Sequence, residues 1–388
     1  MTDRTPLHTH HHGEEPPALH RVAATWLWRA VALCGAVTVL AVLLLWPSGD
    51  DGFDDPLLLD ADTISATVVT ADDVACSYDA TATCRLIGFE MHDGPYAGEF
   101  GTMEHGAVSS LSAGDGIEVT SYETASGAVV YSFYDFDRDG SMLWLLALFV
   151  AAVLLLGRWR GLGALAGLTF SLVAIVMFTL PAILDGSNAV WVALTTASLI
   201  AFAALFLAHG FQVGTAVALL STFASLVVTE LLAWLFVGAT NLTGLSNESS
   251  IMLGGLAAGV DPRGILLAGV VIGALGVLDD VTVTQVSAVW ELKWARPELD
   301  TRELVVPALR IGRDHISSTV NTLFLAYAGA ALPLLLLFTE AGQGFGNVIT
   351  REVVAAEIVR ALVGSIGLVS SVPISTWLAA LVVSGEEA

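Results

Sequence analysis

The stretch GILLAGVVIGALGVLDDVTVTQVSAVWEL, residues 264–292, decides the fold class of the chain. It begins as an apolar run and continues past two adjacent carboxylates, Asp279 and Asp280, with further apolar residues. A run of about 18 or more mainly apolar residues is typical of a membrane-spanning helix. The composition agrees, because 55% of the 388 residues are hydrophobic and only 14% are charged, against about 25% in soluble domains. The sequence therefore predicts an integral membrane protein in contact with a lipid bilayer.

Similar apolar runs recur along the chain. They cover residues 23–46, 141–157, 162–184, 189–208, 213–238, 264–290, 315–338 and 361–384. We expect an all-α polytopic membrane helix bundle of about eight spans, the last seven of them within 141–388. The first run is long and no small-x-small site follows it, which favours an uncleaved anchor over a signal peptide. Residues 251–260 are apolar but too short to cross, and we expect a re-entrant or interfacial segment there.

Residues 47–140, between the first two runs, differ in character. Four short β-prone stretches are separated by Gly, Asp and Ser: ISATVV (64–69), CRLIGFE (84–90), GIEVTSYE (116–123) and AVVYSFYDF (128–136). They predict a small antiparallel sheet or barrel of about five strands. The segment is acidic, with only Arg85 and Arg138 as bases. This charge is typical of an ordinary solvated surface, and it would also attract cations.

The distribution of basic residues sets the expected orientation. With the N-terminus in the cytoplasm, most of the 15 Lys and Arg residues fall on the cytoplasmic side, as the positive-inside rule requires. The bias is strongest at 158–160 and at 292–313, which we expect to be a cytoplasmic loop. Both termini are then cytoplasmic and the β domain is extracytoplasmic. Cys76 and Cys84 lie in that domain, where they would form a disulfide or remain two buried thiols.

Residues 1–22 predict a disordered cytoplasmic tail. The tail is rich in histidine, and a tract of this kind can hold a transition metal loosely. Its candidate ligands are His8, His10, His11 and His12. The alternatives are a solvated low-complexity tail or part of an expression tag.

Polar residues inside the run at 264–290 predict a functional face. A carboxylate at the centre of a membrane helix costs about 2.5–3.5 kcal/mol on insertion scales, so Asp279 and Asp280 should face other helices or water. Asp280, Thr284, Ser287 and Glu291 are spaced so that they share one side of a helix. This polar stripe predicts a cation- or proton-handling site. The alternative is a helix end that already stands in water.

The next apolar run carries a second polar face. His315, Ser318, Thr319 and Thr322 share one side of the expected helix. Such a face allows close helix packing, and His315 can also take up a proton near neutral pH. Because consecutive spans are antiparallel, Asp280 and His315 could meet near the cytoplasmic side. Weaker polar candidates elsewhere are Glu230, His209, Gln212 and Asp185, and the pair Gly269 and Gly273 predicts a packing groove.

Several functions are excluded or disfavoured. A formal net charge of −23 argues against nucleic acid as a partner. The sequence has no nucleotide-binding P-loop, no H-E-x-x-H motif and no G-x-S-x-G motif. No nucleophile–base pair is legible, so we expect no enzymatic activity and no cofactor.

Three stretches resemble one family. GVLDDVTVTQVSAVWEL (276–292), IGRDHISSTVNTLFLAYAGAALPLLLL (311–337) and VRALVGSIGLVSSVPIS (359–375) are similar to the YibE/F-like family of bacterial multipass membrane proteins. The layout of an anchor, an outer β domain and seven further spans is similar too. The resemblance implies a bacterial plasma-membrane protein described as a permease of unestablished substrate. It implies no catalytic residues.

Two functions remain open at this point. The first is a secondary permease of a small solute or ion, with Asp279, Asp280, Glu291 and His315 binding a coupling cation or proton. The second is a non-transporting membrane scaffold or sensor whose β domain binds an envelope partner. Small-residue faces also predict a homo-oligomer, although such faces serve equally within one chain.

Overall fold

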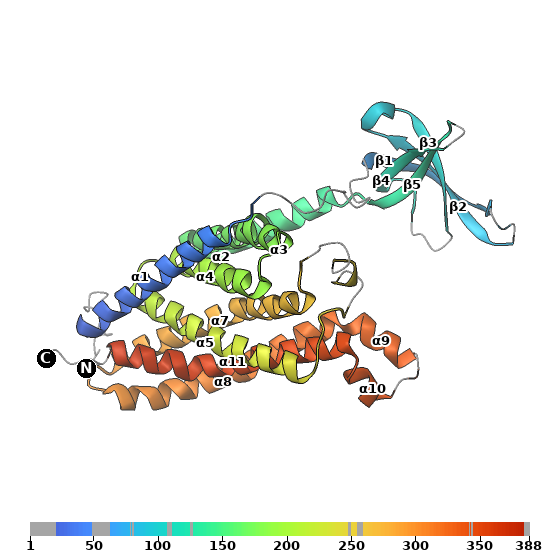
Figure 1. Cartoon of the computed structure of the whole chain (residues 1–388). Coiled ribbons are helices and arrows are strands. Elements are labelled where there is room, and N and C mark those ends of the chain that lie inside the picture. The colour runs from blue at the N-terminus through green and yellow to red at the C-terminus, as the bar shows by residue number, and fades with distance from the viewer. Residues whose placement is uncertain are drawn as a thin grey trace, which may run out of the picture. The chain divides into compact units, whose positions relative to one another are not determined.

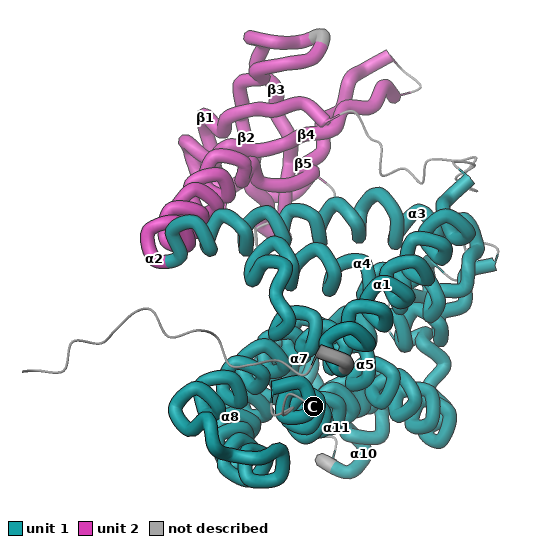
Figure 2. The backbone as a smooth tube through the Cα atoms, turned by 90° about the vertical axis from the view of Figure 1, so that its left-hand side faces the viewer, with its two compact units in different colours: residues 1–53, 157–388 teal, residues 54–156 magenta. Residues whose placement is uncertain are grey.

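A computed structural model describes the chain except for residues 1–20, 49–62, 78, 80, 107–110, 125–126, 247–249, 254–258, 341, 343 and 384–388 (Figure 1). The chain divides into two compact units, one of residues 54–156 and one of the remainder (Figure 2). The predicted His-rich tail and its candidate metal ligands lie outside the described residues. The same holds for residues 254–258 of the expected re-entrant segment.

The smaller unit contains a five-stranded antiparallel sheet, as the sequence predicted. Its strands are β1 (Thr63–Ala75), β2 (Thr83–Met91), β3 (Phe100–Gly106), β4 (Gly116–Glu123) and β5 (Val129–Phe136), in the order β3-β2-β1-β4-β5. A short 3-10 helix, η1 (Gly94–Tyr96), precedes β3. Alternate residues point inward to one apolar core formed by Ile64, Val68, Ile87, Phe89, Met91, Ile117 and Val119 among others.

The sheet is curled rather than flat. β1 carries a bulge between Val68 and Thr70, and bulges increase local twist. Aromatic contacts then join strands that are not hydrogen-bonded neighbours: the His105 and Phe133 rings of β3 and β5 are 5.3 Å apart. The curl therefore brings the two edge strands together over the core.

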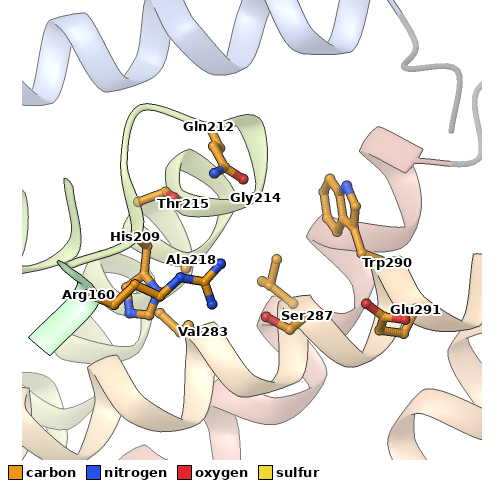
Figure 3. A pocket seen from close by; sticks show the side chains of 11 residues that line it. Arg160, His209, Gln212, Gly214, Thr215, Ala218, Val283, Ser287, Trp290 and Glu291 are labelled. Carbon is orange, nitrogen blue, oxygen red and sulfur yellow. The ribbon is translucent and has the colours of Figure 1, made fainter. Parts of the chain in front are cut away.

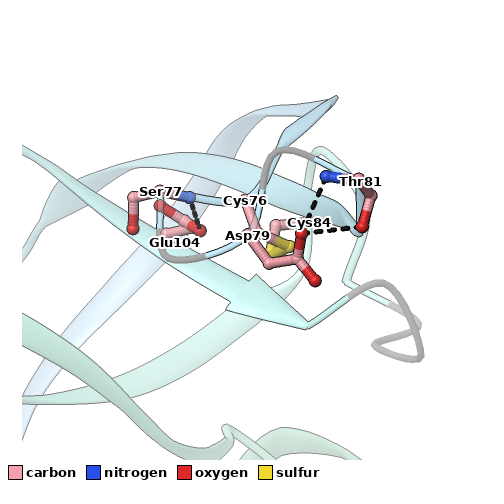
Figure 4. Close-up of a disulfide and its surroundings, with 6 residues drawn as sticks. All are labelled: Cys76, Ser77, Asp79, Thr81, Cys84 and Glu104. Atoms are coloured by element: carbon pink, nitrogen blue, oxygen red, sulfur yellow. Dashed lines mark hydrogen bonds between the residues drawn. A yellow bond between two sulfur atoms is a disulfide. The ribbon is translucent and has the colours of Figure 1, made fainter.

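A disulfide joins Cys76 and Cys84 across the hairpin of β1 and β2, with the two Cα atoms 4.9 Å apart (Figure 4). The turn is braced by carboxylates. Glu104 accepts from the Ser77 amide at 2.8 Å, and Asp79 accepts from the Thr81 amide and hydroxyl at 2.9 and 2.7 Å. The hydrogen bonds from Thr81 lower the pKa of Asp79. Because the cysteine sulfurs are bonded to each other, their closeness to Glu104 does not make a metal site.

The larger unit is helical. Its elements are α1 (Arg21–Leu44), α2 (Asp139–Ala174, which begins in the smaller unit), the π-helical η2 (Ile175–Thr179), α3 (Leu180–Leu184), α4 (Ala189–His209), α5 (Val213–Ala239), α7 (Pro262–Ala295), α8 (Thr301–Ala330), α9 (Leu332–Glu340), α10 (Phe345–Ile349) and α11 (Glu352–Val383). Six helical segments of the described chain are long and apolar enough to cross a membrane. There are seven if α8 and α9, bent by 57° at their junction, form one span.

This count is lower than the expected eight for a local reason. Two of the predicted runs, 141–157 and 162–184, fall in one continuous segment, Asp139–Leu184. That segment is not a single regular helix, because the backbone of Arg158 has φ 49° and ψ −127°. Arg158 therefore marks a junction between two helices.

The expected loop at 292–313 is much shorter in the structure. α7 extends to Ala295 and α8 begins at Thr301, so only residues 296–300 connect them. Asp300 caps α8, accepting from the Glu303 amide at 2.8 Å while the Glu303 carboxylate accepts from the Asp300 amide at 3.1 Å. The first turns of α8 are amphipathic and charged, so they form helix without forming an apolar run.

Three helices form the centre of this unit. α5, α7 and α11 pack against one another side by side, and α4 and α8 flank them (Figure 1). Small residues permit this closeness: a Cβ on Gly367 of α11 would collide with the Thr229 hydroxyl of α5. The described outer surface is rich in exposed Leu, Val, Phe and Trp, as expected for helices surrounded by lipid.

Candidate functional site on the polar side of α7

The centre of the helical unit is rich in hydroxyl groups. Fully or nearly fully buried polar side chains come from all three central helices: Ser221, Thr222, Ser225, Thr229, Thr282, Gln285, Ser371, Ser375 and Thr376. They are hydrogen-bonded. Thr222 meets Thr282 at 2.9 Å, and Gln285 donates to the Thr376 hydroxyl at 2.7 Å and to the Ala308 carbonyl at 2.9 Å. These contacts tie the helices together and satisfy polar groups that water cannot reach.

Two carboxyl groups depart from this pattern. Asp279 Oδ1 and Glu230 Oε2 are buried and have no hydrogen-bond partner in the described part of the chain. The Thr282 hydroxyl, which meets Thr222, also donates to the Asp279 backbone carbonyl at 3.1 Å, so Asp279 lies at the edge of this cluster of hydroxyl groups. A buried ionised carboxylate without a partner is costly, so such a group is favoured as the neutral acid or with a bound cation.

Asp280 has the opposite environment. It is exposed, and it belongs to a continuous stripe of exposed small or polar residues along α7: Gly273, Gly276, Asp280, Thr284, Ser287 and Glu291. We call this stripe the polar face of α7. The positions between them, such as Leu278, Val281 and Val289, are buried. The four predicted stripe residues therefore share one accessible side, and the structure extends that side by two glycines.

The polar face ends in a pocket of about 250 Å³ (Figure 3). The pocket lies between the end of α4, the start of α5, the last turns of α7 and Arg160 of α2. Its polar lining residues are Arg160, His209, Gln212, Thr215, Ser287 and Glu291. Gly210, with φ 77°, ends α4 directly after His209, and Gln212 opens α5 two residues later. This tight turn brings His209 and Gln212 to one wall.

Close helix packing positions Arg160. Gly163 and Gly167 of α2 face α4 so closely that a Cβ on Gly163 would collide with the Leu207 carbonyl, and one on Gly167 would lie 3.2 Å from the Ala204 Cα. These glycines bring the two backbones together and carry Arg160 to the end of α4. His209, the last residue of α4, consequently lies beside Arg160 in the pocket (Figure 3).

The structure brings some of the predicted residues together and leaves others apart. Ser287 and Glu291 line the pocket, whereas Asp280 and Thr284 continue the polar face beyond it. His209 and Gln212, weaker candidates in the sequence, are part of the pocket wall. Arg160 was not a candidate; its only sequence signal was the Arg-Trp-Arg triplet at 158–160.

The polar face of α8 is not part of this pocket. His315 Nε2 is buried without a partner among the described residues, while Ser318 and Thr322 are exposed. The Thr322 hydroxyl donates to the Ser318 carbonyl of its own helix at 3.1 Å. Between the described side chains of Asp280 and His315 there is neither a hydrogen bond nor an ion pair.

The other end of α7 has a different polar cluster. Arg360 and Glu357 of α11 form an ion pair at 2.6 Å. A Cβ on Gly273 would lie 3.3 Å from the Tyr327 hydroxyl, and one on Gly269 would lie 3.7 Å from an Arg360 nitrogen. The glycine pair that predicted a packing groove thus makes room for polar side chains.

Asp185, the remaining weak candidate, has a structural contact. Its carboxylate accepts from the Ser48 amide at 3.0 Å and from the Ser48 hydroxyl at 2.8 Å. These hydrogen bonds lower the pKa of Asp185. They join the end of α3 to the residues that follow α1.

The fold and the site define a polytopic membrane protein with carboxyl groups at its helical core. The chain belongs to the YibE/F-like family, whose model, described as YibE/F-like protein, matches residues 145–385. The match includes the pocket, the polar face of α7 and Asp279, and it leaves the β-sheet outside. No curated protein and no solved structure matches the chain.

Proposed function

We propose that the chain is a secondary permease that moves a small solute or ion across a bacterial plasma membrane, coupled to a proton or another small cation. The observation that carries the proposal is the placement of Asp279. One of its carboxyl oxygens is buried and has no partner among the described residues, yet the next residue, Asp280, lies on the exposed polar face of the same helix. A group that can bind a cation inside the bundle thus lies next to an accessible polar surface.

The two aspartates have different roles in this proposal. Asp280, Thr284 and Ser287 provide a wet surface along which a cation reaches the centre of the bundle. Asp279 then binds it, because a carboxyl in the hydroxyl cluster of Thr222 and Thr282 gains most from a proton or a cation. Intramembrane carboxylates are expensive to keep and are commonly part of ion and proton pathways. Glu230 of α5, which is partly buried and has one buried carboxyl oxygen, is available for the same purpose.

The proposed topology has eight spans with both termini in the cytoplasm. The segment Asp139–Leu184 has 46 residues, or about 70 Å of helix, which is more than twice the roughly 30 Å of a bilayer core. Its break at Arg158 would divide it into two spans. Arg158 and Arg160 then lie on the cytoplasmic side with the pocket, and the β domain with its disulfide lies outside.

A current measurement on reconstituted protein tests the proposal. Proteoliposomes on a solid support are exposed to a panel of amino acids, amines, carboxylates and metal ions. We expect a solute-driven current that Asp279→Asn reduces at least about tenfold, because the amide keeps the shape but has no negative charge for a cation and takes up no proton. Asp279→Glu should retain part of the current. Unchanged current in Asp279→Asn, or no current with any solute, would contradict the proposal.

A second candidate is a scaffold or sensor, favoured by the independence of the β domain. That domain has its own core and disulfide, and it lies outside the family match. In this case the sheet binds an envelope component and the helices anchor it. Two measurements separate the candidates: partner binding that is lost without residues 63–136, in a full-length protein that carries no solute current, favours the scaffold, and a solute-driven current favours the permease.

A further inference from the structure

The pocket at the end of α7 contains opposite charges that do not pair. Arg160 and Glu291 both line it, but no ion pair joins them. The only pairs among described residues are Arg85 with Asp73, Arg138 with Asp135, and Arg360 with Glu357. In Figure 3, Arg160 and Glu291 lie on opposite sides of Ser287. The pocket is therefore bipolar, with a cationic and an anionic side.

The charges are held apart by the fold. Arg160 is held in place because α2 packs closely on α4 at the nearby Gly163 and Gly167. Glu291 is held on the other side by α7, which packs in the centre of the bundle. Neither side chain has a hydrogen-bond partner among the described residues. His209 adds an imidazole to the Arg160 side (Figure 3), so that side has more than one donor for an anion.

The rest of the lining suits a small organic molecule. Gln212 and Ser287 offer neutral hydrogen-bonding groups, and Val283 and Trp290 offer apolar surface. A volume of about 250 Å³ lies below the range of about 300–1,000 Å³ for drug-sized ligands. A guanidinium binds a carboxylate through two parallel hydrogen bonds, and a carboxylate accepts readily from an ammonium group.

We propose that this pocket binds a small zwitterion, with the ligand's carboxylate at Arg160 and its ammonium at Glu291. The inference deepens the permease proposal by naming the class of its solute, and as a transport statement it rests on that proposal. A ligand of one charge would satisfy one side and leave the other unpaired. A zwitterion of suitable length satisfies both and also replaces the ion pair that the protein does not make.

Thermal unfolding of the purified full-length protein in detergent tests the binding. The probes are glycine, γ-aminobutyrate and ε-aminocaproate, which differ in charge separation. Butyrate and butylamine carry one charge each on the same skeleton, and phosphoethanolamine represents a lipid headgroup. We expect at least one amino acid to raise Tm in a concentration-dependent manner, and the three singly charged or phosphate-bearing probes to need at least about tenfold higher concentration.

Variants locate the site. Arg160→Gln and Glu291→Gln should each weaken amino-acid binding at least about tenfold. The matched controls Arg158→Gln and Glu298→Gln alter neighbouring exposed charges outside the pocket and should leave it unchanged. The inference is overturned if no amino acid binds, if butyrate or butylamine binds equally well, if phosphoethanolamine binds best, or if the controls have the same effect.

The outcome for the permease proposal is separate. Amino-acid binding without any solute-driven current would overturn the permease and leave this inference standing. Current driven by another class of solute, with no amino-acid binding, would do the reverse. The permease proposal and the zwitterion inference both hold if Asp279→Asn still binds the amino acid but carries no current.

Discussion

The two ends of α7 differ in whether the charged side chains around them form ion pairs. Near Gly269 and Gly273, Arg360 is paired with Glu357 at 2.6 Å, and the Tyr327 hydroxyl approaches Gly273. At the other end, near Ser287, Arg160 and Glu291 line one pocket without forming an ion pair. Gly273 and Glu291 are 18 residues apart, about 27 Å along the helix, close to the thickness of a bilayer core. One end of the polar face is therefore closed by side chains of the neighbouring helices α8 and α11, while the other end is open to a ligand.

The largest expected difference between the ends is in stability. Glu357→Gln removes the partner of a partly buried arginine, whose Nε already has no partner among the described groups. We expect a loss of about 1–3 kcal/mol, because a charge is left unpaired. Glu291→Gln at the open end breaks no ion pair and should change stability by less than about 0.5 kcal/mol. Denaturation of the two purified variants measures this; equal losses would erase the contrast between the ends.

A smaller effect should follow from filling the closed end. A Cβ on Gly273 would lie 3.3 Å from the Tyr327 hydroxyl, whereas one on Gly276 would meet nothing within 4 Å. Gly273→Val should therefore cost about 1–2 kcal/mol by overpacking. Gly276→Val, one turn further along the same face, is the matched control and should be nearly neutral. Thermal unfolding compares them, and a neutral Gly273→Val would show that Tyr327 is not packed there.

The smallest effect concerns Asp185, whose hydrogen bonds from Ser48 lower its pKa. A depressed pKa in the folded state gives stability that is present above the unfolded value of 3.8 and is lost as pH falls through the folded value. The Tm advantage of the wild type over Asp185→Asn should thus be present at about pH 7 and shrink progressively as the pH is lowered below 3.8. An advantage independent of pH would contradict this account.

Periodicity predicted the polar face of α7, but not which aspartate is buried. The spacing of Asp280, Thr284, Ser287 and Glu291 is local and follows from 3.6 residues per turn. Asp279 and Asp280 are both compatible with an apolar run. Their environments depend on where α5 and α11 lie, and the positions of these helices are part of the tertiary structure, which periodicity does not reveal. The same limit explains Arg160, whose place depends on how closely two glycines let α2 approach α4.

Element boundaries were predictable where the residues of an element were all of one character, such as a run of β-prone or of apolar residues. Four strand stretches were recognised from β-branched and aromatic residues, while β3, FGTMEHG, was missed because its Gly, Glu and His residues resemble a loop. The start of α8, TRELVVPALRIGRDH, was missed because a search for apolar runs excludes charged amphipathic helix. The Asp300–Glu303 capping box was the signal that could have found it.

Cysteine accessibility along α7 tests most directly whether its polar face is in contact with water. On a Cys34→Ala background that keeps the Cys76–Cys84 disulfide, single cysteines replace Gly276, Thr284 and Ser287 on the face, and Leu278, Val281 and Val289 between them. A water-soluble thiol reagent should label the first three rapidly and the second three slowly. Equal rates at both sets, or labelling of the face by a lipid-soluble reagent alone, would contradict a water-lined path to Asp279.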